Sequence, residues 1–189
     1  PSGLGVTAEF RMAGYNQTIG AVIVGNGSIT STTGILTSTS GFTLSPSTGG
    51  TATVSAILAG SVNLTQSGGG TGILSGVNTY TGITTISGGI LQISQDANLG
   101  AAPGTVVANE ITFNGGTLQI TSSFTLNPNR GITLTGAGNI LVDSGQALTY
   151  AGIITGSGNL TKSGAGILAL SGTNTYTGTT DISAGAIAI

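Results

Sequence analysis

Apolar and small polar residues alternate in short segments along the chain, and glycines bound most of these segments. The alternation is clear at 111–113, 117–120, 132–134 and 140–142. A two-residue period is typical of a half-buried β-strand, because successive side chains point to opposite faces of the sheet. Gly, Thr, Ser and Asn interrupt every window long enough to form a helix. The pattern therefore predicts an all-β chain built from short strands.

An internal repeat is the most informative feature of the sequence. Residues 57–93 align with residues 153–189 without a gap, and more than half of the aligned positions are identical. Both copies contain the order Asn-Thr-Tyr-Thr-Gly and end in an apolar strand. Similar strands return at intervals of roughly 20–27 residues, which is the coil length of a β-solenoid. We therefore expect a β-solenoid of about eight coils, each stabilised by stacking on its neighbours.

Composition and charge narrow the possible functions. The chain has 35 glycines among 189 residues, which suits the tight corners of a solenoid. Its mean hydropathy of +0.41 argues against disorder. It has no Cys and no His, so the usual zinc, haem and thiol sites are excluded. Three Lys and Arg residues are too few for a nucleic-acid partner. No apolar run is long enough to predict a transmembrane segment.

Two stretches of the sequence resemble a known bacterial repeat. Residues 163–178, and less cleanly residues 67–82, resemble the autotransporter-associated β-strand repeat of passenger domains. Phrases similar to the linkers of that family occur at 15–20, 96–100 and 114–118. The resemblance implies a secreted, surface-displayed protein with a right-handed parallel β-helix, and it brings no shared catalytic residues. It therefore indicates an extracellular or cell-surface location.

The resemblance also suggests a division of the chain. It covers about residues 14–189 and leaves residues 1–13 outside it as an N-terminal segment. We expect residues 14–189 to form a single β-solenoid that contains the duplicated segments 57–93 and 153–189.

The charged residues suggest no catalytic, cofactor-binding or metal site. Glycoside hydrolysis needs two carboxyl groups that flank one bond, and no two of the five acids lie close in the sequence. We expect these acids to be solvated turn residues: Glu9, Asp96, Glu110, Asp143 and Asp181. Arg11, Arg130 and Lys162 are isolated, and we expect them to be solvated as well. The sequence therefore predicts a protein that is not an enzyme and needs no cofactor.

Three positions recur in the turn of each copy of the repeat. They are Asn78, Tyr80 and Gly82 in the first copy, and Asn174, Tyr176 and Gly178 in the second. The Tyr and Asn side chains could form a platform for a sugar. We favour a structural role, in which Asn bonds to the backbone and Tyr packs on the coil edge, because these residues recur with the repeat itself.

The end of the chain suggests self-association. The strand Ile187-Ala188-Ile189 has no obvious polar cap, and solenoids need caps for solubility. We expect it to pair head-to-tail or strand-to-strand with another copy, or with neighbouring repeats of a longer passenger. The predicted function is a structural, self-associating surface element such as a fibre, stalk or coat. The alternative is an adhesin segment that binds glycans or host surfaces through one face. A polysaccharide-processing enzyme and an outer-membrane barrel fit the sequence less well.

Overall fold

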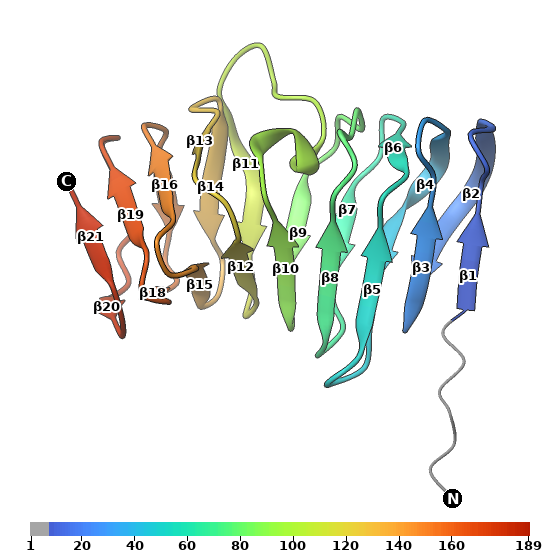
Figure 1. Ribbon diagram of the computed structural model, residues 1–189. Helices are drawn as coiled ribbons and strands as arrows, with labels where there is room; N and C mark the ends of the chain where they lie inside the picture. The colour runs from blue at the N-terminus through green and yellow to red at the C-terminus, as the bar shows by residue number, and fades with distance from the viewer. Residues whose placement is uncertain (1–7) are drawn as a thin grey trace, which may run out of the picture.

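The glycine-bounded segments form short strands that stack in parallel from coil to coil, as the computed structural model of the chain shows for residues 8–189 (Figure 1). Every strand pair in this part of the chain is parallel, and three sheets run along the rod. The predicted all-β solenoid is therefore confirmed. One sheet has nine strands from successive coils, so the rod has about nine coils where the sequence predicted about eight.

The first sheet runs the whole length of the rod. Its strands are β1 (Ala8–Arg11), β3 (Gly27–Thr30), β5 (Thr51–Val54), β8 (Thr71–Leu74), β10 (Ile90–Ile93), β12 (Thr117–Ile120), β15 (Gly138–Val142), β18 (Leu160–Ser163) and β20 (Thr180–Ile182). Because β1 pairs with β3, the sheet begins within the segment 1–13 that we expected to precede the solenoid. The rest of that segment, residues 1–7, lies outside the described residues.

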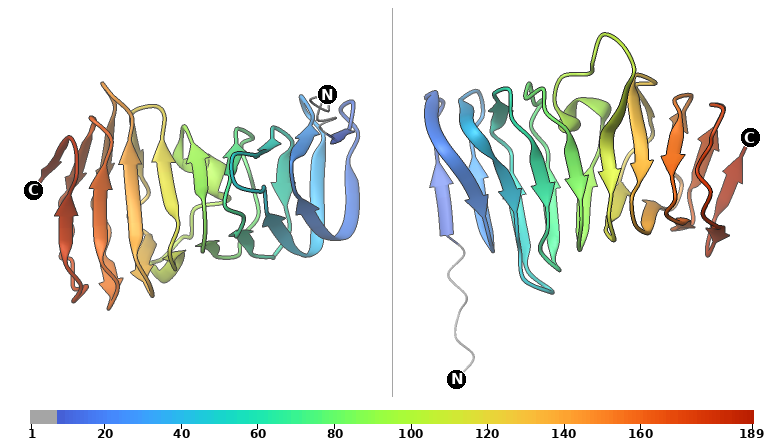
Figure 2. Two further views of the ribbon diagram at one scale, coloured as in Figure 1. Left: turned by 90° about the horizontal axis from the view of Figure 1, so that it is seen from below. Right: turned by 180° about the vertical axis from the view of Figure 1, so that it is seen from behind.

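The second and third sheets form the other sides of the rod, as the views from below and from behind show (Figure 2). The second sheet contains β2 (Gln17–Val24), β4 (Ile35–Leu44), β7 (Leu64–Gln66), β9 (Thr84–Ile86), β11 (Val107–Phe113), β14 (Arg130–Leu134) and β17 (Ile154–Gly156), and β6 (Ile57–Ala59) pairs with the first part of β4. The third sheet contains β13 (Phe124–Leu126), β16 (Ala147–Tyr150), β19 (Ile167–Leu170) and β21 (Ala186–Ala188).

The core is made of ladders of inward-facing side chains, one from each coil. In the first sheet, Leu91, Leu118 and Ile140 are consecutive partners and are buried. The outward positions carry hydroxyl groups. In the second sheet, six consecutive partners are half-buried threonines: Thr43, Thr65, Thr85, Thr112, Thr133 and Thr155. The alternation in the sequence therefore separates an apolar interior from an uncharged hydroxyl-bearing side.

The connection between β10 and β11 is longer than the other connections, and it lengthens the coil of the solenoid to which it belongs. It contains the one helical element of the described residues, the 3₁₀ helix η1 (Asp96–Leu99), and a loop that projects from the rod (Figure 1). The backbone of η1 joins the preceding coil, because the Asn78 N–H donates to the Ala97 carbonyl over 2.9 Å. On its other side η1 packs against β13. It therefore continues the stack of coils on the side where β13 begins the third sheet, in place of a strand. No helix in residues 8–189 is long and apolar enough to cross a membrane.

The two copies of the repeat occupy different sides of the rod. In the first copy, β7 lies in the second sheet and β8 in the first sheet. The corresponding strands of the second copy, β18 and β19, lie in the first and third sheets. The second copy is therefore rotated by one face around the axis, although its sequence aligns without a gap.

Candidate functional site

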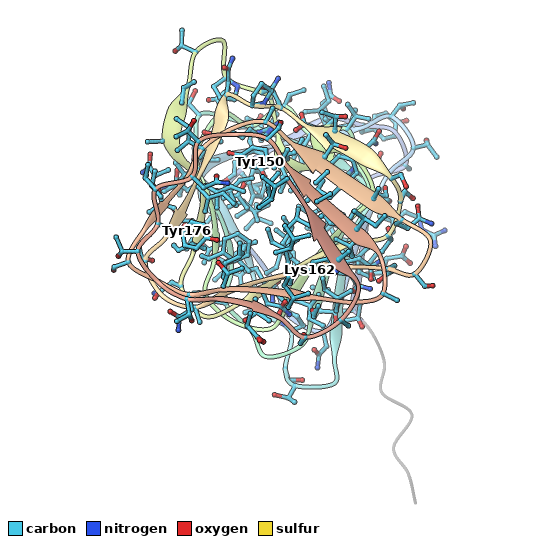
Figure 3. The ribbon with its side chains drawn as sticks, turned by 90° about the vertical axis from the view of Figure 1, so that its left-hand side faces the viewer. Tyr150, Lys162 and Tyr176 are labelled. Carbon is cyan, nitrogen blue, oxygen red and sulfur yellow. The ribbon has the colours of Figure 1, made fainter. Side chains whose placement is uncertain are left out.

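The C-terminal end of the rod exposes the interior of the solenoid. Figure 3 looks along the rod onto this end. The last coils surround a hollow of about 540 Å³, whose lining includes Leu170, Asn174, Tyr176, Ile182 and Ile187. Ile182 faces inward by its register with the buried Lys162, yet it is 51% exposed. This end therefore presents apolar core side chains that no other coil of the described chain covers.

The predicted end strand forms one edge of this hollow. Ile187 and Ile189 line it, and Ile187 packs against the core. Ala188 and Ile189 are exposed. β21 pairs with β19 on one side, and its other edge has no partner strand among residues 8–189. The backbone groups of that edge are thus available for pairing.

Among residues 8–189, the N-terminal end of the rod is open in the same way. A hollow of about 380 Å³ lies between the first coils, and its lining includes Phe10, Ile19 and Ile23. Phe10 is 44% exposed although its register partner Ile29 is buried. Together with the C-terminal hollow, this gives the rod two open ends of apolar character.

The repeat turn of the first copy is packed inside the stack. Asn78 is buried, and its Oδ1 accepts the Leu58 N–H over 2.8 Å while its Nδ2 donates to the Asn98 carbonyl over 2.6 Å. The buried Tyr80 hydroxyl bonds to Thr84, and burial raises the pKa of Tyr80 far above its ordinary value. Gly82 lies against the Val62 carbonyl, where a Cβ would collide. Asn78 thereby connects the coils before and after its own, and the Tyr80 side chain is fully buried.

The same turn in the second copy contacts the preceding coil but has no following coil among residues 8–189. Asn174 Oδ1 accepts the Ile154 N–H over 2.9 Å, and the Tyr176 hydroxyl bonds to Thr180 over 2.6 Å. Gly178 lies against the Gly158 carbonyl, as Gly82 does against that of Val62. The contacts to the preceding coil are thus repeated, but Asn174 and Tyr176 line the C-terminal hollow.

A buried ion cluster corrects the expectation that the charged residues are solvated. Arg130 is 0% exposed, and its guanidinium donates to Asp96 Oδ1 over 3.0 Å and to Glu110 Oε1 over 3.3 Å. It also donates to the carbonyls of Leu99 and Gly100 over 3.0 and 2.6 Å. Arg130 thereby holds η1 and the start of the projecting loop against the stack.

This cluster brings together two acids that are distant in the sequence. Burial raises the pKa of Glu110, and the charge of Arg130 opposes that change. A catalytic pair of carboxyl groups flanks the bond that is to be broken, whereas Asp96 and Glu110 flank a buried guanidinium. We therefore assign the cluster a structural role. Asp181 and the ion-paired Glu9 are exposed, as expected, and Asp143 accepts a hydrogen bond from Gln119.

Lys162 is the second cation that is buried against expectation. Its Nζ donates to the carbonyls of Ser163, Gly164 and Ala184 at 2.7–3.2 Å, and burial lowers the pKa of Lys162. The corresponding residue of the first copy, Gln66, is also buried and donates to the Gly68 carbonyl. The signal was present in the sequence, because Lys162 lies two residues after the inward Leu160 and so faces inward.

Metal-binding groups do not gather in the described chain. Residues 8–189 contain no group of three or more acidic side chains that could hold a metal ion. The open ends therefore remain the strongest candidates for a functional surface.

Comparison with known proteins agrees with this architecture. Residues 64–93 and 160–189 match the family model of the passenger-associated-transport-repeat. The chain is similar to the adhesin BmaC autotransporter of Brucella suis biovar 1 (strain 1330), with 47% identity over 138 residues. That alignment covers 73% of this chain and 4% of the relative. No solved structure gives a significant match. Residues 64–93 and 160–189 are thus two copies of the passenger-associated-transport-repeat found in bacterial autotransporter passengers, and the location is extracellular or at the bacterial cell surface.

Proposed function

We propose that the chain is a structural, non-catalytic rod segment of an autotransporter passenger, which self-associates through its open ends. The observation that carries this proposal is the pair of apolar hollows at the two ends. Stacking at these ends would extend the first sheet, whose edge strands are β1 and β20, and bury residues such as Phe10 and Ile182. At a strand spacing of 4.7–4.8 Å, nine coils span about 40 Å. Head-to-tail stacking would lengthen this rod and leave its lateral surfaces unchanged.

Charge supports stacking at the ends. The exposed charged residues of the described chain are Glu9 and Arg11 on the first coil, and Asp181 on the last strand of the first sheet. With a net charge of −2, copies of the chain repel one another little. Arg11 and Glu9 pair with each other at the N-terminal end, so Asp181 at the other end meets no net like charge in a head-to-tail contact.

Light scattering after size-exclusion chromatography, together with negative-stain microscopy across a dilution series, tests the proposal. We expect filaments of uniform width that dissociate on dilution. Ile182→Asp should give a monomer, because it places a charge in the C-terminal hollow. The matched control is Val77→Asp, which changes an apolar residue that is 55% exposed and lines neither end hollow. A wild-type chain that stays monomeric at high concentration overturns self-association.

A second candidate function is adhesion, since the similar Brucella protein is named an adhesin. Stacking on sugars requires exposed aromatic rings; Tyr80 and Tyr150 are buried, and the exposed Phe10 and Tyr15 lie on the first coil. The threonine ladder of the second sheet offers a row of hydroxyl groups for neutral glycans instead. A glycan array with the wild-type chain and Thr85→Val tests this role. Binding that Thr85→Val abolishes, with the bound glycan recovered uncleaved, supports a non-catalytic adhesin. An array without binding excludes this segment as the adhesive part.

A further inference from the structure

The internal duplication indicates what fits the C-terminal hollow. Residues that line the hollow correspond one by one to residues of the first copy. Leu170, Asn174, Tyr176 and Ile182 correspond to Leu74, Asn78, Tyr80 and Ile86. All four first-copy residues are at most 3% exposed. The hollow is therefore the uncovered form of a site that is filled in the first copy.

In the first copy the part of the site around Asn78 and Tyr80 is filled by the segment that directly follows it, whereas Ile86 is covered by its register partner Phe113. Residues 94–101 contain η1, whose Leu99 is buried and whose Asn98 carbonyl accepts the Asn78 amide. Asn98 Nδ2 donates to the Gly76 carbonyl over 2.9 Å, and the Ala101 N–H donates to the Tyr80 carbonyl over 2.9 Å.

A close contact with glycine completes the filled site. Gly100 has φ +83° and lies on the Tyr80 ring, where a Cβ would come within 3.1 Å of two ring carbons. A left-handed backbone and this tight approach both require glycine. The filling segment is thus specified by an Asn, a Leu and a Gly in succession.

The second copy has the same groups without a partner. The Asn174 Nδ2 makes no hydrogen bond within residues 8–189, although its Oδ1 is bound as in the first copy. Gly172 corresponds to Gly76, whose carbonyl accepts Asn98.

We propose that the C-terminal hollow binds an Asn-Leu-Gly turn of the η1 type, supplied by the next coil of the same passenger chain. The proposal rests on the role as a rod segment of a passenger proposed above, and it names what stacks at this end within one passenger chain. The incoming Asn carbonyl accepts a hydrogen bond from Asn174 Nδ2, the incoming Asn side chain donates to the Gly172 carbonyl, and the Leu fills the space beside Tyr176.

The test extends the full chain after Ile189 by eight residues that copy Ser94–Ala101, and measures amide hydrogen exchange. We expect exchange in residues 172–178 to slow by about tenfold or more, as added hydrogen bonds and burial reduce local opening. An extension in which Ala replaces the Asn and the Leu should give no protection. Equal protection by both extensions, or by neither, overturns the proposal.

A pair of variants separates specific binding from a general effect on the end coil. Asn174→Asp keeps the acceptor for the Ile154 N–H but removes the Nδ2 donor, so the extension should no longer protect it. Asn159→Asp adds the same charge and keeps the acceptor for the Thr179 N–H, but residue 159 does not line the hollow. It should be protected like the wild type. Loss of protection in both variants contradicts the proposed contact.

Failure of the turn-binding proposal can be distinguished from failure of the proposed self-association, because the extended chain tests the first and the unextended chain tests the second. The unextended chain tests stacking through its concentration-dependent association. If that association occurs but the extension gives no protection, the end binds a second copy and not an η1-type turn. If the extension protects but the unextended chain stays monomeric, the turn is correct and self-association is wrong.

Discussion

Arg130 is the residue whose surroundings differ most from the sequence-based expectation. It was expected in solvent, but it is fully buried. It contacts the Asp96 carboxylate and the Leu99 and Gly100 carbonyls thirty or more positions earlier, and the Glu110 carboxylate twenty positions earlier. A buried charge is tolerated only when it is paired and hydrogen-bonded. The long coil with η1 supplies these partners, so Arg130 and that coil depend on each other.

The first prediction concerns the removal of this cation. Arg130→Met should lower the free energy of unfolding at pH 7 by about 3–5 kcal/mol, because it leaves a buried carboxylate without its partner. Urea unfolding followed by circular dichroism measures the change. Arg11→Met is the control, since the Arg11–Glu9 pair is exposed and its loss should have no measurable effect. Equal effects of the two changes would mean that the cluster contributes nothing to stability.

The second prediction concerns pH. Burial holds the pKa of Glu110 above its unfolded value, so the folded state binds a proton at this residue more tightly than the unfolded state does. The stabilisation that results is complete below the unfolded pKa, and it is lost as the pH rises through the folded pKa. Glu110→Gln should therefore lose stability relative to the wild type when the pH falls from 7 to 4. Thermal unfolding across this range measures the difference, and a difference independent of pH contradicts the prediction.

Strand parity explains which side chains the sequence could place and which it could not. Alternation identified the inward Leu118 and Ile140, and the same rule puts Lys162 inside. Lys162 was expected in solvent because it is an isolated charged residue in the sequence. The partners of Arg130 could not be predicted, because Asp96 and Glu110 reach it only through the irregular path of the long coil.

At the scale of elements, the duplicated strands form as their sequences predict but lie in different sheets. Local alternation determines that β8 and β19 are strands, whereas their sheet depends on the number of residues in all the coils between them. The long coil after β10 changes that number, and its length has no local signal. The solenoid and its corners were therefore predictable, but the rotation of the second copy was not.

The third prediction compares equivalent glycines of the two copies. A Cβ at Gly82 would collide with the Val62 backbone, and one at Gly178 with the Gly158 backbone. Gly82→Ala should cost about 1–3 kcal/mol, because coils on both sides prevent a shift. Gly178→Ala should cost less, because the last coil can move outward. The melting temperatures of both variants test this, and equal losses would show that the last coil is as rigid as the interior.

At the scale of the molecule, the rod consists of coils that contact only their neighbours. In such arrays stability depends on the interfaces between adjacent units, so a terminal coil with one interface is the least stable. The interior coils around β9 and β10 have two interfaces and a fully buried core. The two open ends and the stable middle are thus consequences of one architecture.

The fourth prediction follows for the isolated monomer. Amide protection should be lowest in β1, β20 and β21 and should rise toward β9 and β10, because opening begins at the ends. Hydrogen exchange with mass spectrometry, under dilution that prevents association, measures the gradient. Uniform protection along the chain would mean that the rod unfolds as a single cooperative unit.

The rotation of the second copy by one face has a consequence for inheritance. Recombination between the two copies, at the shared Asn-Thr-Tyr-Thr-Gly coding sequence, would delete the intervening coils and return the following chain on another side of the rod. That product still has a strand for each side, because the same repeat is accepted in more than one sheet. A deletion or duplication in such a gene can therefore remove or add a number of coils that is not an integer.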